Sequence, residues 1–345
     1  GLHLIFPKAE FNNTGTLSGF VPGSSPGVPT QGGEATSEKS AEVPNFFYSQ
    51  PVGQDLVFGL GFSSPYGLAT DYDKGWVGRY VALETDLMTI NGNAALAWQV
   101  SEQVSLGVGL SAVYGDALLS NAINFGLAYL NGLNSGTIPA TPETLALAQD
   151  VQASLGSSTY DGSLRLEGDD WGYGFNFGIL ITPTATTRIG LHYRSSVKLE
   201  LSGTADFTVG ALEAFFGSAF IDQGGKVDLE LPDTAQVSIH HQLTPEWAVM
   251  ADLYHTWWSK FDELVIEYET GFPSDSVIPE RWDEAWRYSI GTAYQATEAL
   301  QLRAGLVYDE SPVTSDLYRS PRIPDADRLW VTLGLGYQVS EALRL

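Results

Sequence analysis

The sequence predicts an all-β fold, a transmembrane antiparallel β-barrel of about twelve strands. Three observations favour it. Apolar residues alternate with small or polar residues over long stretches, tryptophan and tyrosine gather near the ends of these stretches, and brief turns alternate with long acidic connections. The third observation is typical of outer-membrane barrels, which have short periplasmic turns and long external loops.

The period-two alternation is clearest between Trp171 and Ile181, where aromatic and aliphatic side chains occupy every second position and mostly glycine fills the others. Residues 104–114, 188–201 and 329–339 follow the same rule. Successive side chains of a strand point to opposite faces, so each run has one apolar face. Runs of about ten residues match tilted membrane-crossing strands better than the roughly 5–6 residues of soluble sandwich strands.

Composition excludes several classes of function. The chain has 345 residues with 41 acidic and 17 basic side chains, a formal net charge of −24, and no cysteine. Such a charge without a basic run argues against nucleic-acid partners, because phosphate would be repelled. The absence of cysteine excludes disulfides, thiolate zinc sites and a cysteine nucleophile. No apolar run approaches the roughly 20 residues of a membrane helix.

The strands are expected, with loose ends, at 1–8, 44–52, 54–70, 83–100, 103–119, 163–182, 186–203, 226–243, 246–268, 284–297, 299–313 and 327–340. Short turns fall at 101–103, 182–184 and 243–246. Aromatic residues that we expect in a girdle at the membrane interface include Trp247, Trp257, Trp258, Trp282 and Trp286.

Two inserts interrupt the strand pattern. Residues 121–160 and 205–225 carry apolar side chains at helical spacing, among them Ile123, Leu127, Leu130, Leu212, Phe215, Phe216 and Phe220. Short helices in loops are therefore expected. They either pack on the barrel or form an apolar landing site for a hydrophobic ligand.

Seven blocks of residues, taken in order, resemble the FadL/TodX family of outer-membrane transporters for long-chain fatty acids and other hydrophobic compounds. They lie at 64–70 (SPYGLAT), 87–91 (LMTIN), 112–115 (AVYG), 171–180 (WGYGFNFGIL), 193–198 (YRSSVK), 309–313 (DESPV) and 322–328 (RIPDADR). The resemblance covers nearly the whole chain. It implies a multi-pass barrel in the bacterial outer membrane, in contact with lipid and lipopolysaccharide, that acts as a monomer.

The family fold has fourteen strands and an N-terminal hatch that plugs the lumen. Against that pattern, residues 1–345 are expected to form a single barrel domain that lacks the hatch and the last strands. The sequence would then be a partial record of a longer protein or, alternatively, a natural twelve-stranded relative.

The resemblance also implies a route for ligand by facilitated diffusion. The third strand of the family is kinked and opens the barrel wall, and the matching residues are Ser64, Pro65, Tyr66 and Gly67. Without the resemblance, this segment would be an ordinary strand end or bulge. The inserts 121–160 and 205–225 correspond to the external loops L3 and L4, and the residues expected to form their capture groove are Phe125, Leu127, Leu130, Leu212, Phe215, Phe216 and Phe220.

A fatty acid needs a cation for its carboxylate. Candidates on polar faces are Arg188, Arg194 and Lys198, with Arg287, Arg303 and Arg328 further along the chain. Each could equally form an ion pair with an acidic neighbour. Asn121 and Asp283 stand where the family is expected to have basic residues, so the headgroup site is either rebuilt from other residues or selects uncharged hydrophobic molecules.

Other chemistries find little support. The adjacent His240 and His241 point to opposite faces of a strand and cannot share a metal. The acidic pairs Asp71/Asp73, Asp169/Asp170 and Asp325/Asp327 are expected to be solvated loop carboxylates rather than cation sites. No cofactor, metal or catalytic residue is expected, since no nucleophile-elbow, Walker or zinc-protease motif occurs. The alternatives are an aromatic-hydrocarbon channel of the same family, a non-specific porin, an outer-membrane lipase, and a soluble lipid-binding barrel.

Overall fold

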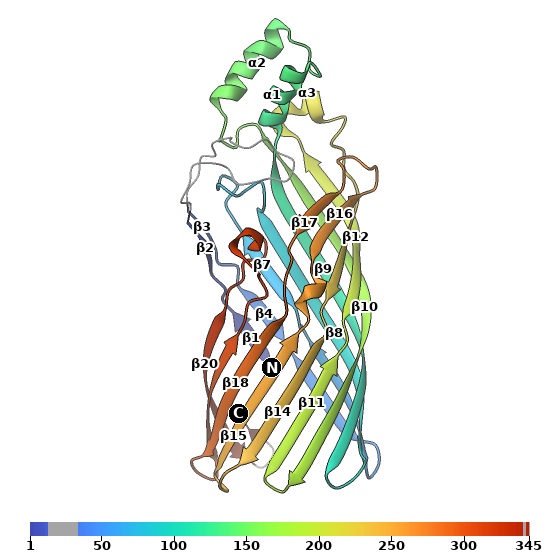
Figure 1. The fold of residues 1–345 in the computed structure, drawn as a ribbon, viewed down its shortest axis with the longest axis vertical. Helices are drawn as coiled ribbons and strands as arrows, with labels where there is room; N and C mark the ends of the chain where they lie inside the picture. The colour runs from blue at the N-terminus through green and yellow to red at the C-terminus, as the bar shows by residue number, and fades with distance from the viewer. Residues whose placement is uncertain (13–33, 341–342, 345) are drawn as a thin grey trace.

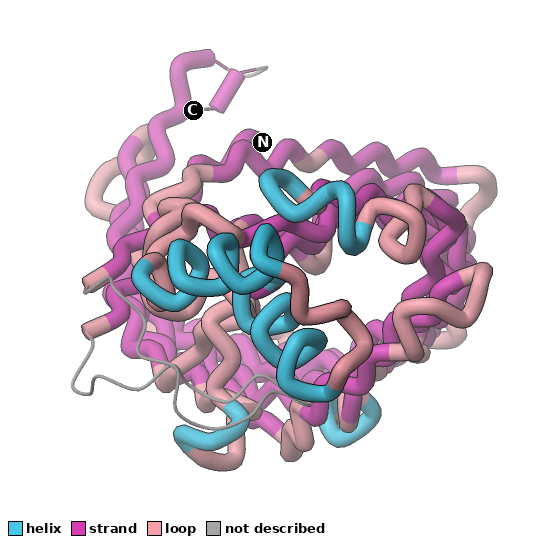
Figure 2. Tube along the Cα trace, turned by 90° about the horizontal axis from the view of Figure 1, so that it is seen from above, coloured by secondary structure: helices cyan, strands magenta, loops and turns pink. Residues whose placement is uncertain are grey.

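A computed structural model of the chain describes residues 1–12, 34–340 and 343–344. One large antiparallel sheet curves into a barrel, and helices stand at one end of it (Figure 1). Seen from above, these helices lie over the ring of strands (Figure 2). No helix of the described residues is both long and apolar enough to cross a membrane.

The barrel strands are β5 (Phe46–Pro51), β6 (Leu56–Ser63), β7 (Gly67–Asp71), β8 (Glu84–Gln99), β9 (Val104–Asn124), β10 (Asp161–Thr184), β11 (Thr187–Arg194), β12 (Val197–Thr208), β13 (Gln223–Leu231), β14 (Thr234–Gln242), β15 (Trp247–Thr256), β16 (Glu263–Tyr268), β17 (Ser276–Pro279), β18 (Ala285–Gln295), β19 (Leu300–Asp309), β20 (Arg328–Ser340) and β21 (Leu343–Arg344). The helices are α1 (Phe125–Ser135), α2 (Pro142–Ala153) and α3 (Glu213–Phe216), with 3₁₀ turns η1 (Gly210–Leu212), η2 (Trp258–Lys260) and η3 (Asp316–Tyr318).

Neighbouring strands pair in antiparallel register, and in the strand order β21 stands between β20 and β5. Every predicted run after the first corresponds to one or two of these strands, and the short turns join strands at the end away from the helices, as predicted. The prediction of a barrel strand at 1–8 is wrong. Its residues form β1 (Leu2–Ile5), which pairs with β4 (Ala41–Pro44), while β2 (Ala9–Phe11) pairs with β3 (Ala35–Ser37). Pro7 interrupts the run after too few residues to cross a membrane.

The outer face of the barrel is an apolar band. Tyr173 is 75% exposed beside Ala112, and Leu110 is 71% exposed beside Phe175 on the next strand. The band continues through Ile290 on β18 and Leu333 on β20, which are 62% and 85% exposed. Large apolar side chains exposed on every second residue indicate a surface in contact with lipid.

The wall has two levels, because several strands break midway. Asn176 of β10 faces Arg194, whereas Asp169 faces Ser202, so the strand formed by β11 and β12 contains one extra residue at the break. The Ser195 hydroxyl accepts a hydrogen bond from the Phe175 amide there (2.9 Å). One extra residue inverts the faces of the strand that follows.

The inversion changes what fills the lumen. Ile189, Leu191 and Tyr193 face outward, but Val197, Leu199 and Leu201 face inward, where they belong to a buried cluster with β10, β13 and β16. The prediction that all six share one face is therefore wrong. Toward the helical end the lumen is filled by aliphatic side chains, and toward the turn end it is lined by small and polar ones.

The helices of the first insert form as predicted. Asn124 caps α1 by accepting a hydrogen bond from the Leu127 amide, Thr141 makes a capping box at α2, and Gly136 ends α1 with φ of 78°. In the second insert, 205–225, helical structure is limited to η1 and the single turn of α3. Glycines at 210 and 217 bound this segment and weaken it as a helix.

The orientation of the wall can be tested on two neighbouring residues of β18. Ile290→Arg places a charge in the apolar band and should destabilise the barrel by about 2–4 kcal/mol if it lies near the bilayer midplane. The matched change Ser289→Arg points inward beside Asp252 of β15 and should cost far less. Urea unfolding in detergent or lipid measures the free energy of unfolding of both variants. An equal loss of stability in the two would contradict the assignment of Ile290 to the outer face and Ser289 to the inner face.

Candidate ligand-binding site

A chamber of about 380 Å³ lies in the lumen at the level of the strand breaks. It is lined where the shorter strands end, by Arg194, Thr234, Thr256, Ala285, Asp309 and Arg328. Residues 65–68 of the predicted kink form another part of its wall. The structure thus brings together the predicted wall opening and three of the predicted cations.

Two of these cations are neutralised. Asp309 is 3.1 Å from Arg287 and 3.2 Å from Arg328, and Arg328 is also 2.9 Å from Asp325. The ion-pair alternative therefore describes Arg287 and Arg328.

Arg194 differs from both. It lines the chamber, its Nε is buried without an acceptor, and the side chain forms no hydrogen bond or ion pair with any described residue. Its cross-strand neighbours, Asn176 and Thr234, are uncharged. A partly buried guanidinium with free donors is a suitable partner for an anionic group.

The remaining predicted cations lie elsewhere. Arg188 is opposite His240, nearer the turn end, and Arg303 donates to Gln301. Lys198 lies on the outer face with a 79% exposed side chain, because the break at 195–196 inverts the faces of β12, so its predicted lumenal position is wrong.

The predicted kink is a break between β6 and β7. Ser63 faces Asn91 but Gly67 faces Met88, so one extra residue lies in the kinked strand, around Ser64 and Pro65. At this break the Thr89 hydroxyl takes the place of backbone pairing between strands. It accepts a hydrogen bond from the Tyr66 amide (3.0 Å) and donates one to the Tyr66 carbonyl (2.5 Å).

The other edge of β7 has no strand partner among the described residues. Side chains hold it instead, since Thr70 and Tyr72 donate to the carbonyls of Arg322 and Pro321. The wall beside the chamber is therefore weakly paired at this point.

The two helical loops meet at the far end of the barrel in an aromatic cluster. Phe125 contacts Phe216 and Phe220 at ring distances of 5.1 and 4.8 Å, and Tyr129 contacts Phe215 at 4.8 Å. Of the residues predicted for the groove, Phe125 and Leu212 are fully buried and act as core, whereas Phe215 is exposed and Leu127, Leu130, Phe216 and Phe220 are half-buried.

Sequence reasoning missed two members of this cluster. Tyr129 lies one helical turn after Phe125, so its spacing could have revealed it. Phe272, in the connection between β16 and β17, packs on Phe220 at 5.2 Å, and no local pattern signals that contact.

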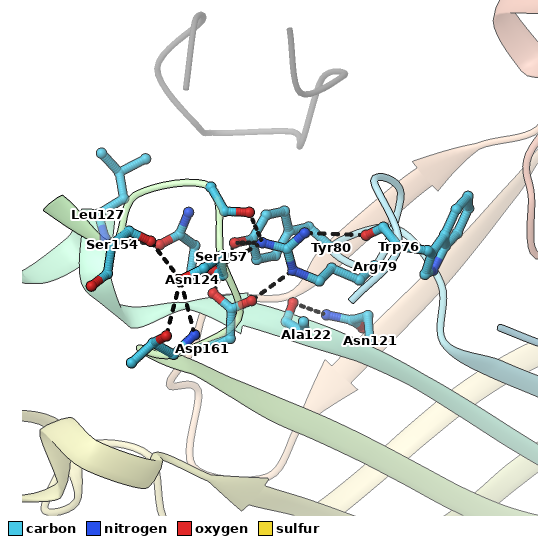
Figure 3. A network of polar contacts seen from close by, with 12 residues as sticks. Trp76, Arg79, Tyr80, Asn121, Ala122, Asn124, Leu127, Ser154, Ser157 and Asp161 are labelled. Carbon is cyan, nitrogen blue, oxygen red and sulfur yellow. Dashed lines mark hydrogen bonds and ion pairs between the residues drawn. The ribbon is translucent and has the colours of Figure 1, made fainter. Parts of the chain in front are cut away.

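A buried arginine fixes the base of the α1–α2 hairpin (Figure 3). Arg79 is fully buried, its Nε is 2.7 Å from Asp161 Oδ2, and it donates to the carbonyls of Trp76, Gly156 and Ser157. The Tyr80 hydroxyl donates to the other Asp161 oxygen. Because each guanidinium nitrogen of Arg79 already donates a hydrogen bond to a protein oxygen, we assign Arg79 a structural role.

A small apolar cavity of about 60 Å³ lies between this end and the chamber. Leu68, Leu87, Leu229, Phe261 and Ile323 line both spaces. Trp258 and Trp282 also face the lumen, 4.9 Å apart, rather than the expected girdle, because they follow or precede the ends of β15 and β18.

Next to Ile323, the buried Arg322 donates to the Ser120 carbonyl and to Asn121 Oδ1. Burial lowers the pKa of Arg322 to about 10, and burial raises the pKa of Glu280, in the connection before β18, to about 7. The connection between β19 and β20 is thus anchored across the lumen to β9.

An apolar outer band, a lumen filled at one level and a chamber beside a break in the wall define a membrane-spanning barrel for hydrophobic molecules. The family model described as outer membrane protein transport protein (OMPP1/FadL/TodX) matches residues 2–345, and the chain belongs to that family. Its members are transporters or channels of the outer membrane.

Relatives agree with this assignment. The long-chain fatty acid transport protein of Escherichia coli O6:H1 is 34% identical over 316 residues, which are 88% of this chain and 67% of that protein. Outer membrane protein P1 of Haemophilus influenzae Rd is 30% identical over 342 residues, 97% of this chain and 72% of that protein.

Solved structures share the fold. A Pseudomonas aeruginosa FadL homologue superposes with a TM-score of 0.78 at 24% identity, covering 99% of this chain and 77% of the other. The Pseudomonas putida toluene transporter TodX gives 0.63 at 20% identity, covering 90% and 77%.

The clamp at the hairpin base can be tested by Arg79→Met. Removing one member of a buried pair leaves Asp161 unpaired and should cost about 3–5 kcal/mol locally, so the amides of α1 and α2 should exchange hydrogen much faster. Arg165→Met is the control, because its ion pairs with Glu84 and Glu167 are exposed and should contribute under about 1 kcal/mol. Similar exchange in both variants would contradict the structural role of Arg79.

Proposed function

We propose that this chain carries long-chain fatty acids or similar hydrophobic acids across the outer membrane by facilitated diffusion. The observation that carries the proposal is Arg194, which forms no hydrogen bond or ion pair with a described residue and lies in a chamber beside the kinked wall. The fatty-acid transport proteins among its relatives support the same substrate class.

The proposed route begins at the aromatic cluster formed by α1, α3 and the β16–β17 connection. Burying an alkyl chain there contributes about 0.8 kcal/mol per methylene, which is enough for capture from water. The small apolar cavity, whose wall at Leu68 and Ile323 also lines the chamber, leads to the chamber, where Arg194 binds the carboxylate. The ligand then leaves sideways at Ser64–Gly67, next to β7, which has no second strand partner among the described residues.

One alternative is supported by the chamber itself. Tyr66, Tyr254, Trp258 and Trp282 line it, and such rings suit small aromatic hydrocarbons as well as alkyl chains. A wide aqueous pore is disfavoured, because aliphatic side chains fill the lumen toward the helical end. We further propose that the protein acts as a monomer, with its apolar band in contact with lipid and lipopolysaccharide.

The carboxylate assignment is tested by comparing oleate with oleyl alcohol, which has the same chain length and no charge. Arg194→Gln should weaken oleate binding roughly 10- to 150-fold, the equivalent of about 1.5–3 kcal/mol for a charge-assisted hydrogen bond, and leave the alcohol unaffected.

Arg188→Gln is the control, since Arg188 faces the lumen outside the chamber. If Arg194→Gln weakened the binding of oleate and of oleyl alcohol equally, or if Arg188→Gln weakened oleate binding as much, Arg194 would not be the partner of the carboxylate. Toluene uptake without oleate uptake by the unmodified protein would favour the aromatic-hydrocarbon channel.

The capture step is tested by the double change Phe215→Ala/Phe216→Ala. It removes the exposed ring of Phe215 and the half-buried ring of Phe216 from the aromatic cluster, and it should lower oleate uptake several-fold at limiting concentration, with little effect at saturation. Leu145→Ala on α2 is the control, because Leu145 is exposed but does not belong to the cluster. Uptake unchanged by the double variant would place capture elsewhere.

A further inference from the structure

Thr234 stands beside Arg194 in the wall of the chamber. The two residues form a cross-strand pair between β14 and β11, and both line the chamber. Asn176, the neighbour of Arg194 on the other side, does not line it. Directly opposed residues of an antiparallel pair have Cβ atoms about 4.5–5.5 Å apart, so the side chains of Arg194 and Thr234 can bind the same small group.

The hydroxyl of Thr234 has no partner in the protein. The residue is 2% exposed, yet its side chain forms no hydrogen bond with any described residue. The Nε of Arg194 is likewise buried without an acceptor. Buried donors without acceptors are destabilising, and one bound anion would satisfy both.

Other hydroxyl groups of the chamber are placed less well for this purpose. The Tyr66 hydroxyl already donates to the Pro232 carbonyl (3.0 Å). Tyr254 lies opposite Arg287, whose guanidinium is 5.4 Å from the centre of its ring. Thr256 belongs to the same cross-strand row as Thr234, but it stands one strand further from Arg194, a distance of about 5 Å.

The carboxylates near this row are engaged elsewhere. Of those that line the chamber, Asp309 and Asp325 are paired with arginines of β18 or β20, and Glu310 accepts a hydrogen bond from a backbone amide (3.2 Å). Asp233, which precedes β14, is 2.5 Å from Lys260. The donors of β11 and β14 are therefore not occupied by a described carboxylate.

We propose that the Thr234 hydroxyl donates a second hydrogen bond to the carboxylate held by Arg194 and is a specificity-determining residue of the chamber. An ionised carboxylate has about four lone-pair sites, so a guanidinium leaves room for a further donor. A hydrogen bond to an ionised acceptor is roughly twice as strong as one to a neutral acceptor, so Thr234 favours an acid over an alcohol of the same chain length. The inference rests on the proposed function, because it needs the carboxylate at Arg194.

The test is equilibrium binding of labelled oleate and labelled oleyl alcohol to the purified protein in detergent. Thr234→Val removes the hydroxyl at nearly constant shape and should weaken oleate binding roughly tenfold or more, with a smaller effect on the alcohol. Thr234→Ser keeps a hydroxyl and should bind oleate nearly as the unmodified protein does. Thr256→Val is the matched control, because it makes the same change one strand further from Arg194 and should leave oleate binding unchanged.

A second measurement combines Thr234→Val with Arg194→Gln. Two residues that bind one group have non-additive effects, so Thr234→Val should cost less oleate affinity in the Arg194→Gln protein than in the unmodified one. Folding of each variant is checked by its heat-modifiable mobility in detergent gels. Thr234→Ala, which also lacks the hydroxyl, replaces Thr234→Val if the valine variant does not fold.

The outcomes separate this inference from the proposed function. Oleate binding unchanged by Thr234→Val, an equal loss in Thr256→Val or Thr234→Ser, or additive effects with Arg194→Gln would overturn the role of Thr234. If Arg194→Gln weakens oleate binding selectively and Thr234→Val does not, the inference fails and the proposed function stands. If Arg194→Gln leaves oleate binding unchanged, the carboxylate does not lie at Arg194 and both fail.

Discussion

The extra residue at the strand breaks determines the interior of this barrel. A strand that continued in register from β11 into β12 would point Leu199 and Leu201 at lipid and leave the lumen toward the helical end polar. The inserted residue reverses the faces, so these side chains meet Leu164 and Leu166 of β10 in a buried cluster. The backbone groups freed at each break find local partners, such as Ser195 beside Phe175 and Thr89 beside Tyr66. The chamber lies at this level because the shorter strands end there.

Charge in the lumen follows from the same register. Arg287 and Arg328 flank Asp309 across three adjacent strands, so they are neutralised within the wall. Arg194 stands between Asn176 and Thr234 and has no such neighbour. In a chain with 41 acidic and 17 basic residues, a guanidinium without a carboxylate partner is a costly arrangement that a bound anion would relieve.

The sequence contained most of the fold, because period-two alternation and turn placement are local signals. The strands after residue 44 other than β17 and β21, together with the brief turns, were predicted from these signals, and helical spacing predicted the helices of the first insert. The outward position of Lys198 was not predicted, because parity counting assumes an unbroken register and one inserted residue at 195–196 reverses the parity. Trp258 was misplaced for a related reason, because it falls within the predicted run 246–268 but beyond the end of β15. Trp282 was misplaced because it precedes both the predicted run 284–297 and β18. The anchors formed by Arg79 and Arg322 join segments 82 and about 200 residues apart, and no local pattern reports such contacts.

The clamp of Arg79 and Asp161 has a consequence for how the molecule can change. It ties the two ends of the α1–α2 hairpin to the rim. The residues beyond it form a unit together with η1 and α3, because Tyr129, Ile138 and Val151 share one core with Val209 and Leu212. Substitutions or grafts within that unit leave the strand register and the chamber untouched. The two helical loops can therefore diverge in sequence independently of the strands, and both loops of one barrel could be transplanted together onto another that keeps the same arginine and aspartate.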